Sequence, residues 1–307
     1  MPKIEYVSKN FREAALSTIR QAETICLEYQ ARGFNLTLRQ LYYQFVARGM
    51  IPNRQQEYKR LGDVVNDARL AGLLDWNWLE DRTRNVRELA HWTSPENAIQ
   101  AIEQQFQTDR WNRQPVRPVV MIEKDAIIGV IEGVCETNDV PYFSCRGYVS
   151  QSEMWAMGER LIEYVDAGQR PIIFHLGDHD PSGIDMTRDI TDRLTMFLGG
   201  DVEVERLALN VEQVRTFNPP PNPAKDTDAR FASYIRLYGD ECWELDALDP
   251  TTLSDLVENA IDSVRDRDLW NEAIDEDREV QRKLGLARRH WPELSVWIDN
   301  EGWTGLA

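Results

Sequence analysis

The sequence is poor in cysteine, in long apolar runs and in positive charge. Its four cysteines, Cys26, Cys135, Cys145 and Cys242, have no Cys-x-x-Cys spacing, which argues against a disulfide scaffold and a zinc site. No apolar run approaches the ~18 residues of a membrane span, and the first residues lack a signal-peptide pattern. The net charge of −17 argues against a general nucleic-acid binder, because phosphate contacts need cations. We expect a cytoplasmic protein with reduced thiols and no membrane partner.

The charge is unevenly distributed along the 307 residues. Residues 31–90 contain ten Arg or Lys and seven Asp or Glu, a local charge of +3. Residues 240–279 contain fifteen acids and three bases, a local charge of −12. The first region could therefore meet DNA, whereas the second would keep the protein soluble or repel DNA.

Residues 1–92 have the pattern of a small helical domain. Apolar residues at three- and four-residue spacings predict helices over 8–31, about 37–48 and about 55–74. The alternation in Trp76–Val86 predicts a strand pair or wing. Together these elements favour a winged helix-turn-helix whose third helix enters a DNA groove. Small helical domains without a DNA function have a similar pattern.

From residue 117 the pattern changes to alternating strands and helices, which predicts an α/β fold with a parallel sheet. The expected strands are 118–123, 140–145, 171–177 and 202–208, and the expected helices are 126–138, 151–167 and 183–198. Residues 93–116 form a connector with a helix near 95–107. The sheet domain spans 117–250, and 251–307 is a helical C-terminal extension. The Pro-rich stretch Asn218–Asp228 is expected to have no regular structure.

Two of the expected strands end in acidic residues. Glu123 and Lys124 follow the first, and Asp178 and Asp180 follow the third, just before a Pro-x-Gly and a helix. Carboxylates at the carboxyl ends of neighbouring strands can hold Mg²⁺, which prefers oxygen ligands. We therefore predict a metal site made of Glu123, Asp178 and Asp180. In the alternative interpretation the two aspartates only cap the next helix, and Lys124 either contacts phosphate or pairs with an acid. His179 is expected to point away from the metal.

The segment Arg39–Tyr43 is the second candidate site. Helical geometry places Leu38, Leu41, Tyr42 and Phe45 in one buried arc. Tyr43 falls outside that arc, on the flank of Arg39, which predicts an exposed hydroxyl beside a guanidinium. Because a tyrosine hydroxyl is a poor nucleophile at neutral pH, its chemistry would need a nearby cation or metal. Alternatively, Tyr43 is an ordinary surface residue.

The two sites together resemble a family of DNA-cleaving proteins. Arg39-Gln40-Leu41-Tyr42-Tyr43, Glu123-Lys124 and Asp178-His179-Asp180-Pro181-Ser182-Gly183 are similar, in order, to motifs of the topoisomerase VI (type IIB) A subunit and the meiotic double-strand-break transesterases. Arg146-Gly147-Tyr148 and Glu244-Leu245-Asp246-Ala247-Leu248 are weaker similarities. The resemblance spans about 35–250. It implies a winged-helix (CAP-like) domain that carries the tyrosine, followed by a Toprim domain with a Rossmann-like parallel sheet.

This resemblance implies an enzyme of the isomerase class that cuts double-stranded DNA near the nucleoid. Tyr43 would attack a backbone phosphorus and form a 5′-phosphotyrosyl link, and Arg39 would stabilise the phosphoryl charge, with Lys124 as a further catalytic cation. Mg²⁺, or Mn²⁺ in its place, would be held by Glu123, Asp178 and Asp180. In the family a tyrosine of one subunit meets the metal site of the other, which implies a homodimer. Strand passage would need a separate ATPase subunit.

Two other functions fit the same residues. In a Toprim nuclease, metal-activated water would cut the DNA and Tyr43 would be structural. In a DNA-binding or regulatory module, the fold would persist without catalysis, and the net charge is in keeping with this alternative. A covalent protein–DNA adduct distinguishes the first hypothesis from both alternatives.

Overall fold

The computed structural model describes residues 3–79, 89–224 and 228–301. The chain divides into two compact units, which we describe separately. The first unit combines Met1–Arg84 with Pro118–Ser263, and the second combines Asn85–Arg117 with Val264–Ala307. Within the described ranges, no helix has both the length and the apolar character needed to cross a membrane.

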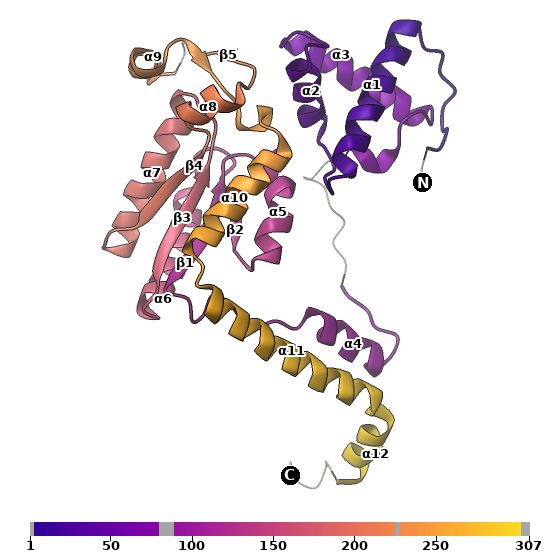
Figure 1. The fold of residues 1–307 in the computed structure, drawn as a ribbon, viewed down its shortest axis with the longest axis vertical. Coiled ribbons are helices and arrows are strands. Elements are labelled where there is room, and N and C mark those ends of the chain that lie inside the picture. Colours follow the sequence, from indigo (N-terminus) through magenta and orange to yellow (C-terminus); the bar gives the residue numbers. More distant parts are fainter. Residues whose placement is uncertain (1–2, 80–88, 225–227, 302–307) are drawn as a thin grey trace. The chain divides into compact units, whose positions relative to one another are not determined.

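Three helices form the N-terminal part of the first unit (Figure 1). They are α1 (Glu13–Gln30), α2 (Leu38–Ala47) and α3 (Gln55–Leu70). α2 begins at a capping box, in which the Thr37 hydroxyl accepts from the Gln40 N–H while the Gln40 side chain accepts from the Thr37 N–H. The helices pack around a common core that includes Ile25, Tyr29, Leu41, Phe45 and Leu61. The three predicted helices are therefore confirmed, although α1 and α3 are shorter than expected.

The predicted wing is only partly within the described residues. Trp76–Trp78 is a 3-10 helix and not a strand, because the Asp75 carboxylate accepts from the Asn77 N–H and caps a tight turn. Leu79 then forms an isolated bridge with Leu36. The rest of the predicted wing, 80–86, lies outside the described residues, so the winged-helix assignment stays a prediction.

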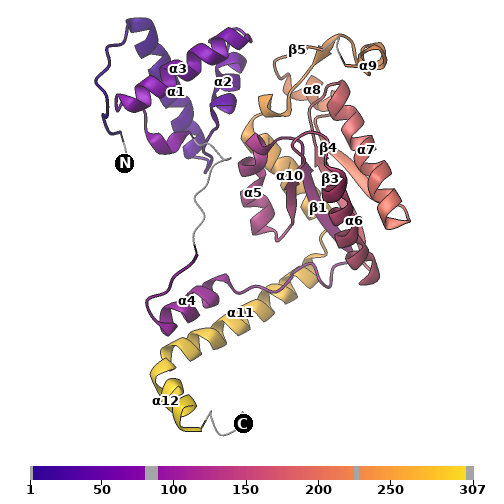
Figure 2. The same ribbon diagram turned by 180° about the vertical axis from the view of Figure 1, so that it is seen from behind.

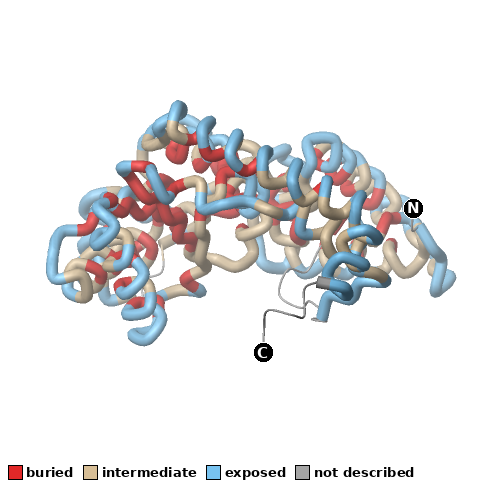
Figure 3. Tube along the Cα trace, turned by 90° about the horizontal axis from the view of Figure 1, so that it is seen from below, coloured by how far each residue is buried: buried red, intermediate tan, exposed pale blue. Residues whose placement is uncertain are grey.

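A parallel four-stranded sheet lies at the centre of the second part of this unit. Its strands have the order β2-β1-β3-β4. They are β1 (Val116–Ile122), β2 (Tyr142–Ser144), β3 (Arg170–Leu176) and β4 (Glu203–Ala208). Every residue of β1, and every residue of β3 after Arg170, is buried, as expected for strands covered on both faces. Figure 3 colours the buried residues of the described chain red. The four predicted strands and the α/β class are thus confirmed.

Helices cover both faces of the sheet. α6 (Gln151–Asp166) and α7 (Pro181–Leu198) pack on one face, with Met154, Leu161, Ile190 and Leu194 against the strands. Figures 1 and 2 show α5 (Ile128–Thr137) and α10 (Pro250–Val264) on the opposite face. The predicted crossover helices therefore exist close to their expected bounds.

The strand order reverses between β1 and β3. The chain passes from β1 outward to β2 and then returns to β3 on the other side of β1. In open α/β sheets, ligands bind outside the carboxyl ends of the strands where the order reverses in this way. The Glu123 N–H donates to the Leu176 carbonyl, so the ends of β1 and β3 are directly joined.

The segment after β4 contains short elements. They are α8 (Val211–Phe217), β5 (Asn222–Pro223), α9 (Phe231–Tyr238) and β6 (Glu241–Cys242). β5 pairs antiparallel with β6, with Asn222 opposite Cys242. The expectation that Asn218–Asp228 has no regular structure is therefore wrong at β5, because the extended backbone that its prolines favour finds a partner strand. This pairing brings the Asn222 amide to 3.4 Å from Glu244 Oε1.

The second unit consists of helices. They are α4 (Pro95–Gln105), α11 (Arg267–Arg289) and α12 (Trp291–Glu301). α4 packs along α11, where Glu103 pairs with Arg288 at 2.8 Å. Farther along, Trp111 is fully buried against Trp270, with ring centroids 5.5 Å apart. The helix of the predicted connector and the predicted C-terminal extension therefore fold together.

Candidate functional site

The acids at the ends of β1 and β3 lie together. Glu123 Oε2 accepts from the Asp178 N–H at 2.8 Å. A Cβ atom on Gly177 would lie 3.0 Å from the same oxygen, so the turn leaves little room for another residue there. Burial and the Asp178 carboxylate raise the pKa of Glu123 to about 7, and Asp180 acts in the same direction. The charges of the two aspartates therefore both act on the Glu123 carboxyl group.

The two aspartates after β3 have different roles in the turn. Asp180 caps α7, since its Oδ1 accepts from the Gly183 N–H at 2.7 Å. The buried Asp178 does not cap the helix: its Oδ1 accepts from the Leu245 N–H at 2.8 Å, and its Oδ2 lies 2.6 Å from Lys124 Nζ. The interpretation that the two aspartates only cap the next helix is therefore correct for Asp180. It does not explain Asp178, which contacts Leu245 and Lys124 instead.

Gly183 explains the spacing of the Asp-x-Asp-Pro-x-Gly motif. A Cβ atom at this position would lie 2.2 Å from the Asp178 carbonyl oxygen, far inside van der Waals contact. Glycine therefore allows the first turn of α7 to approach the backbone that carries Asp178. The turn therefore requires the glycine of the motif, and the two aspartates supply its carboxylates.

Lys124 lies among three carboxylates. Besides Asp178, its Nζ is 2.9 Å from Glu244 Oε2 and 3.7 Å from Asp246 Oδ1. Of the two interpretations of Lys124, pairing with acids is the one seen in this structure.

Arg39 connects α2 to the same acids. Its guanidinium donates to Glu244 Oε2, and its Nε lies 2.5 Å from Asp246 Oδ2. Asp246 is only 2% exposed, and burial raises its pKa while Lys124 and Arg39 oppose that shift. A continuous network of ion pairs therefore runs from Arg39 through Glu244 to Lys124 and Asp178.

Tyr43 is buried, which corrects the prediction of an exposed hydroxyl. Its exposed fraction is 4%, equal to that of Tyr42. The helical arc was assigned from α2 alone, whereas the turn Leu245–Ala247, which is far away in the sequence, packs against the same helix. The Arg39 guanidinium lies 5.8 Å from the Tyr43 ring centroid, so the predicted proximity of this cation is confirmed. Burial and Asp246 raise the pKa of Tyr43, and Arg39, Asn222 and Lys124 partly offset this.

A cavity of about 430 Å³ adjoins Tyr43. It is lined by residues of α2, the segment before α3, α3 itself and the β5–β6 region: Arg39, Tyr42, Tyr43, Asn53, Gln55, Tyr58, Asn222 and Glu244. Tyr42 contributes ring surface here while its hydroxyl bonds to Asn53 at 2.9 Å. The candidate nucleophile and the cation beside it thus share one cavity.

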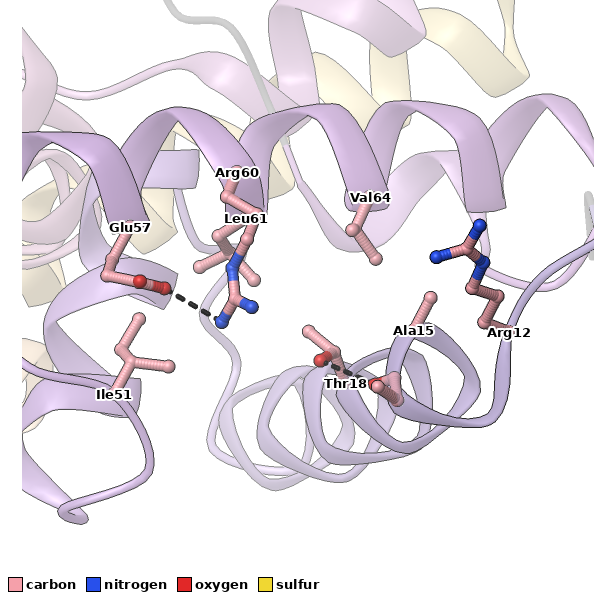
Figure 4. Close-up of a pocket in the computed structure, with 9 residues that line it drawn as sticks. Arg12, Ala15, Thr18, Ile51, Glu57, Arg60, Leu61 and Val64 are labelled. Atoms are coloured by element: carbon pink, nitrogen blue, oxygen red, sulfur yellow. Dashed lines mark hydrogen bonds and ion pairs between the residues drawn. The ribbon is translucent and has the colours of Figure 1, made fainter.

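A smaller cavity of about 210 Å³ lies between α1 and α3 (Figure 4). Its walls are mainly apolar, and Figure 4 shows Arg12 and Arg60 at its edges, with Arg60 paired to Glu57 at 2.7 Å. The cavity lining includes none of the predicted site residues.

His179 packs within an aromatic cluster. Its Nδ1 is 2.7 Å from the Tyr234 hydroxyl, and its ring contacts Tyr238 and Trp243. Burial lowers the pKa of His179 to about 4, so the imidazole is neutral at pH 7. We assign it a packing role.

The weaker Arg146-Gly147-Tyr148 segment joins other partners. The Tyr148 hydroxyl donates to Asp185 Oδ2 at 2.6 Å and accepts from Arg230. Arg146 pairs with Asp125 at 2.7 Å. These contacts tie the loop before α6 to α7 and α9 and leave the predicted metal ligands untouched.

Two important residues were absent from the sequence-based set. Arg206 on β4 donates to the carbonyls of Gly177 at 3.0 Å and Asp178 at 2.5 Å, which holds the turn that presents Asp178. Burial lowers the pKa of Arg206 to about 10. The position of Arg206 near the end of a predicted strand is the one sequence feature that could have identified it. The second residue is Asp246, whose only sequence feature is its place in the weak Glu244–Leu248 similarity.

The donor types suit a divalent metal ion, although the side chains are not arranged as a ready site. Among the residues that the structure describes, no group of three or more His, Cys, Asp or Glu is placed to hold a metal ion. Carboxylate oxygens are nevertheless the ligands that Mg²⁺ prefers. The raised pKa of Glu123 reflects burial and a nearby carboxylate charge, and the positive charge of a bound cation would offset both effects. For Asp178, the positive charge of the Lys124 ammonium has that effect in this structure.

Comparison of the chain with protein-family models, curated proteins and solved structures found no match.

Proposed function

We propose that the protein cleaves double-stranded DNA by metal-dependent tyrosine transesterification, as the resemblance to the topoisomerase VI A subunit implies. The observation that supports this best is the network from Arg39 through Glu244 and Lys124 to Asp178. It connects the helix that carries Tyr43 to the carboxyl edge of the sheet. A tyrosine, two cations and strand-end acids are the parts that this chemistry needs.

In the proposed reaction the Tyr43 oxygen attacks a backbone phosphorus. The Tyr43 hydroxyl loses its proton as its oxygen bonds to phosphorus, the P–O3′ bond breaks, and the phosphate stays on Tyr43 as a 5′-phosphotyrosyl link. The leaving 3′-oxygen takes up a proton, so that the step has no net change in protons. Arg39, adjacent to the Tyr43 ring, would stabilise the charge that develops on the phosphoryl oxygens. Because burial raises the pKa of Tyr43, the positive charge of Arg39 and Lys124 is needed to favour the tyrosinate.

Glu123, Asp178 and Asp180 would hold the metal ion. A bound Mg²⁺ or Mn²⁺ would supply a Lewis acid for the scissile phosphate and the 3′-oxygen. Lys124 would then exchange its contact with Asp178 for a contact with phosphate. The protein would act as a homodimer that cuts both strands, with a separate ATPase subunit needed for strand passage.

The burial of Tyr43 favours a second candidate, a metal-dependent nuclease that uses water. Because the Tyr43 side chain is 4% exposed, its hydroxyl group reaches a phosphate only after a rearrangement, whereas hydrolysis by water does not need that contact. In that case Tyr43 is structural, and the same acids carry the reaction. A DNA-binding module without catalysis is the third outcome.

Covalent capture tests these candidates. End-labelled supercoiled or linear duplex DNA is incubated with the full chain and Mg²⁺ or Mn²⁺, quenched with SDS and run on a denaturing gel. We expect a labelled protein band that is lost in Tyr43→Phe and in Asp178→Ala. Tyr6→Phe is the matched control, because Tyr6 is 64% exposed and does not line the cavity. Cleavage that survives Tyr43→Phe but not Asp178→Ala would indicate the nuclease, and DNA binding without cleavage would indicate the module.

A further inference from the structure

We infer that the 430 Å³ cavity beside Tyr43 binds one unstacked nucleobase of the DNA strand, with preference for a base that carries an amino group, such as cytosine. This inference rests on the proposed function, because it assigns part of the substrate to a place in the same site. It concerns binding, however, and can be tested without any cleavage.

The cavity has the size for a base. Pockets for small ligands typically enclose about 300–1,000 Å³, and a cavity of about 150 Å³ already accommodates a benzene ring. At about 430 Å³, the space beside Tyr43 can take a pyrimidine and several water molecules.

The walls offer aromatic surface. Tyr42 packs edge to face against both Tyr43 and Tyr58, with ring centroids 5.3 Å apart in each pair. Tyr58 is only partly buried, so some of its ring surface stays accessible from the cavity. Bases stack on such side chains whatever their sequence.

The polar groups favour a base over a phosphate. Glu244 lines the cavity, and its carboxylate would repel a phosphate at that part of the wall. Glu244 Oε2 is engaged by Lys124 at 2.9 Å, whereas Oε1 lies 3.4 Å from the Asn222 amide, a long contact that leaves acceptor capacity. A carboxylate accepts well from the N4 amino group of cytosine. Thymine has an oxygen at that position, which the carboxylate would repel.

The position of the cavity matches the proposed chemistry. Tyr43 and Arg39 both line it, so a nucleotide whose phosphate is attacked by Tyr43 has its base within reach of the cavity. Enzymes that act on duplex DNA often take a base out of the stack and bind it between aromatic side chains.

Oligonucleotide binding tests the inference. The probes are the tetranucleotides d(CCCC) and d(TTTT) and an abasic tetranucleotide with the same phosphates, titrated by calorimetry. The full-length Tyr43→Phe protein is used with EDTA present, so that no cleavage contributes. We expect d(CCCC) to bind most tightly and the abasic strand most weakly.

Substitutions in this background locate the base. Tyr58→Ala should weaken d(CCCC) binding about tenfold or more and leave the abasic strand unchanged, while Tyr58→Phe retains stacking and affinity. Glu244→Gln should remove the preference for d(CCCC) over d(TTTT). Tyr6→Ala, an exposed tyrosine outside the cavity, should change nothing. Circular dichroism confirms that each variant is folded.

The inference is overturned if the abasic strand binds as tightly as d(CCCC), if d(CCCC) shows no binding, or if Tyr58→Ala and Tyr58→Phe are equally weak. Base-dependent binding in a protein that never cleaves DNA would support the cavity assignment while refuting the proposed transesterase. Cleavage without base-dependent binding would do the reverse.

Discussion

Arg39 and Asp246 form an ion pair, with 2.5 Å between Nε and Oδ2, in which the Asp246 side chain is 0% exposed and the Arg39 side chain 41% exposed. The pair joins α2 to the segment that follows β6. The same carboxylate lies 3.7 Å from Lys124, so one buried acid helps to neutralise both cations of the candidate site. Asp246 therefore holds both cations in place and contributes to the stability of the fold.

We predict that Asp246→Ala lowers the free energy of unfolding by about 1–3 kcal/mol, because Arg39 and Lys124 lose a buried partner. Urea unfolding measures this difference. Asp275→Ala is the control: its pair with Arg278 has both side chains more than 70% exposed, and we expect a change within about 0.5 kcal/mol. Equal effects of the two substitutions would contradict a structural role for the Asp246 pair.

Gly183→Ala should destabilise the protein by at least about 2 kcal/mol, since its Cβ would meet the Asp178 carbonyl at 2.2 Å. Gly133→Ala in α5 provides a matched control, because a Cβ there has nothing within 4 Å. Alanine at that helical position should be neutral or stabilise by about 0.5–1 kcal/mol. The midpoints of denaturant unfolding check both values. A Gly183→Ala protein as stable as the parent would show that the turn is looser than described.

Mg²⁺ affinity should fall as the pH is lowered below about 7. The pKa of Glu123 is raised to about 7, so a proton on this carboxyl competes with the metal below that pH. One competing proton changes the affinity by up to about tenfold per pH unit. Calorimetric titration at pH 6, 7 and 8 measures the effect.

Two Glu→Gln substitutions, one at the predicted ligand and one at a control position, test the role of Glu123. Glu123→Gln should weaken binding and flatten the pH dependence. Glu132→Gln, on α5 beside the Tyr142 hydroxyl, should keep both. An affinity in the parent protein that does not change with pH would argue against Glu123 as a ligand.

Acid should destabilise the fold partly through His179. Its pKa is about 4 in the folded protein and 6.5 in an ordinary environment. Between these values the unfolded chain binds a proton that the folded protein excludes. The contribution of His179 to stability is therefore complete above pH 6.5 and is lost as the pH falls toward 4, by up to about 1.4 kcal/mol per pH unit.

Stability curves from pH 4 to 8 check this expectation. His179→Asn keeps a polar group near the Tyr234 hydroxyl but removes the titration, so its stability should fall less steeply in acid. His290→Asn should follow the parent protein, because the His290 side chain is 64% exposed. A His179→Asn curve parallel to that of the parent would exclude His179 as a source of acid sensitivity.

Much of the fold could be predicted because its signals are local. The apolar runs of β1 and β3, the helical spacings of α1 to α3 and the Asp180-Pro181 start of α7 each depend on residues a few positions apart. Alternation of strands and helices then implies a parallel sheet. Parallel strands end at the same edge, which is why Glu123 and Asp178 were expected close together and are found so.

The burial of Tyr43 could not be predicted in this way. The helical arc of α2 correctly identified the core residues Leu41, Tyr42 and Phe45, but it could not show a second contact surface on the flank of Arg39. That surface includes Asn222 and Asp246, which are far away in the sequence. For the same reason, the pairing of α4 with α11 was not foreseen.

The sequence by itself determined the α/β alternation, the placement of the acids at the strand ends and the capped start of α7, because each follows from interactions between near neighbours. Only the tertiary structure decided which cation pairs with which acid: Lys124 with Asp178 and Glu244, and Arg39 with Glu244 and Asp246. Ion pairing depends on distance and burial between segments that meet only after folding. It is this choice of partners that links Tyr43 to the edge of the sheet.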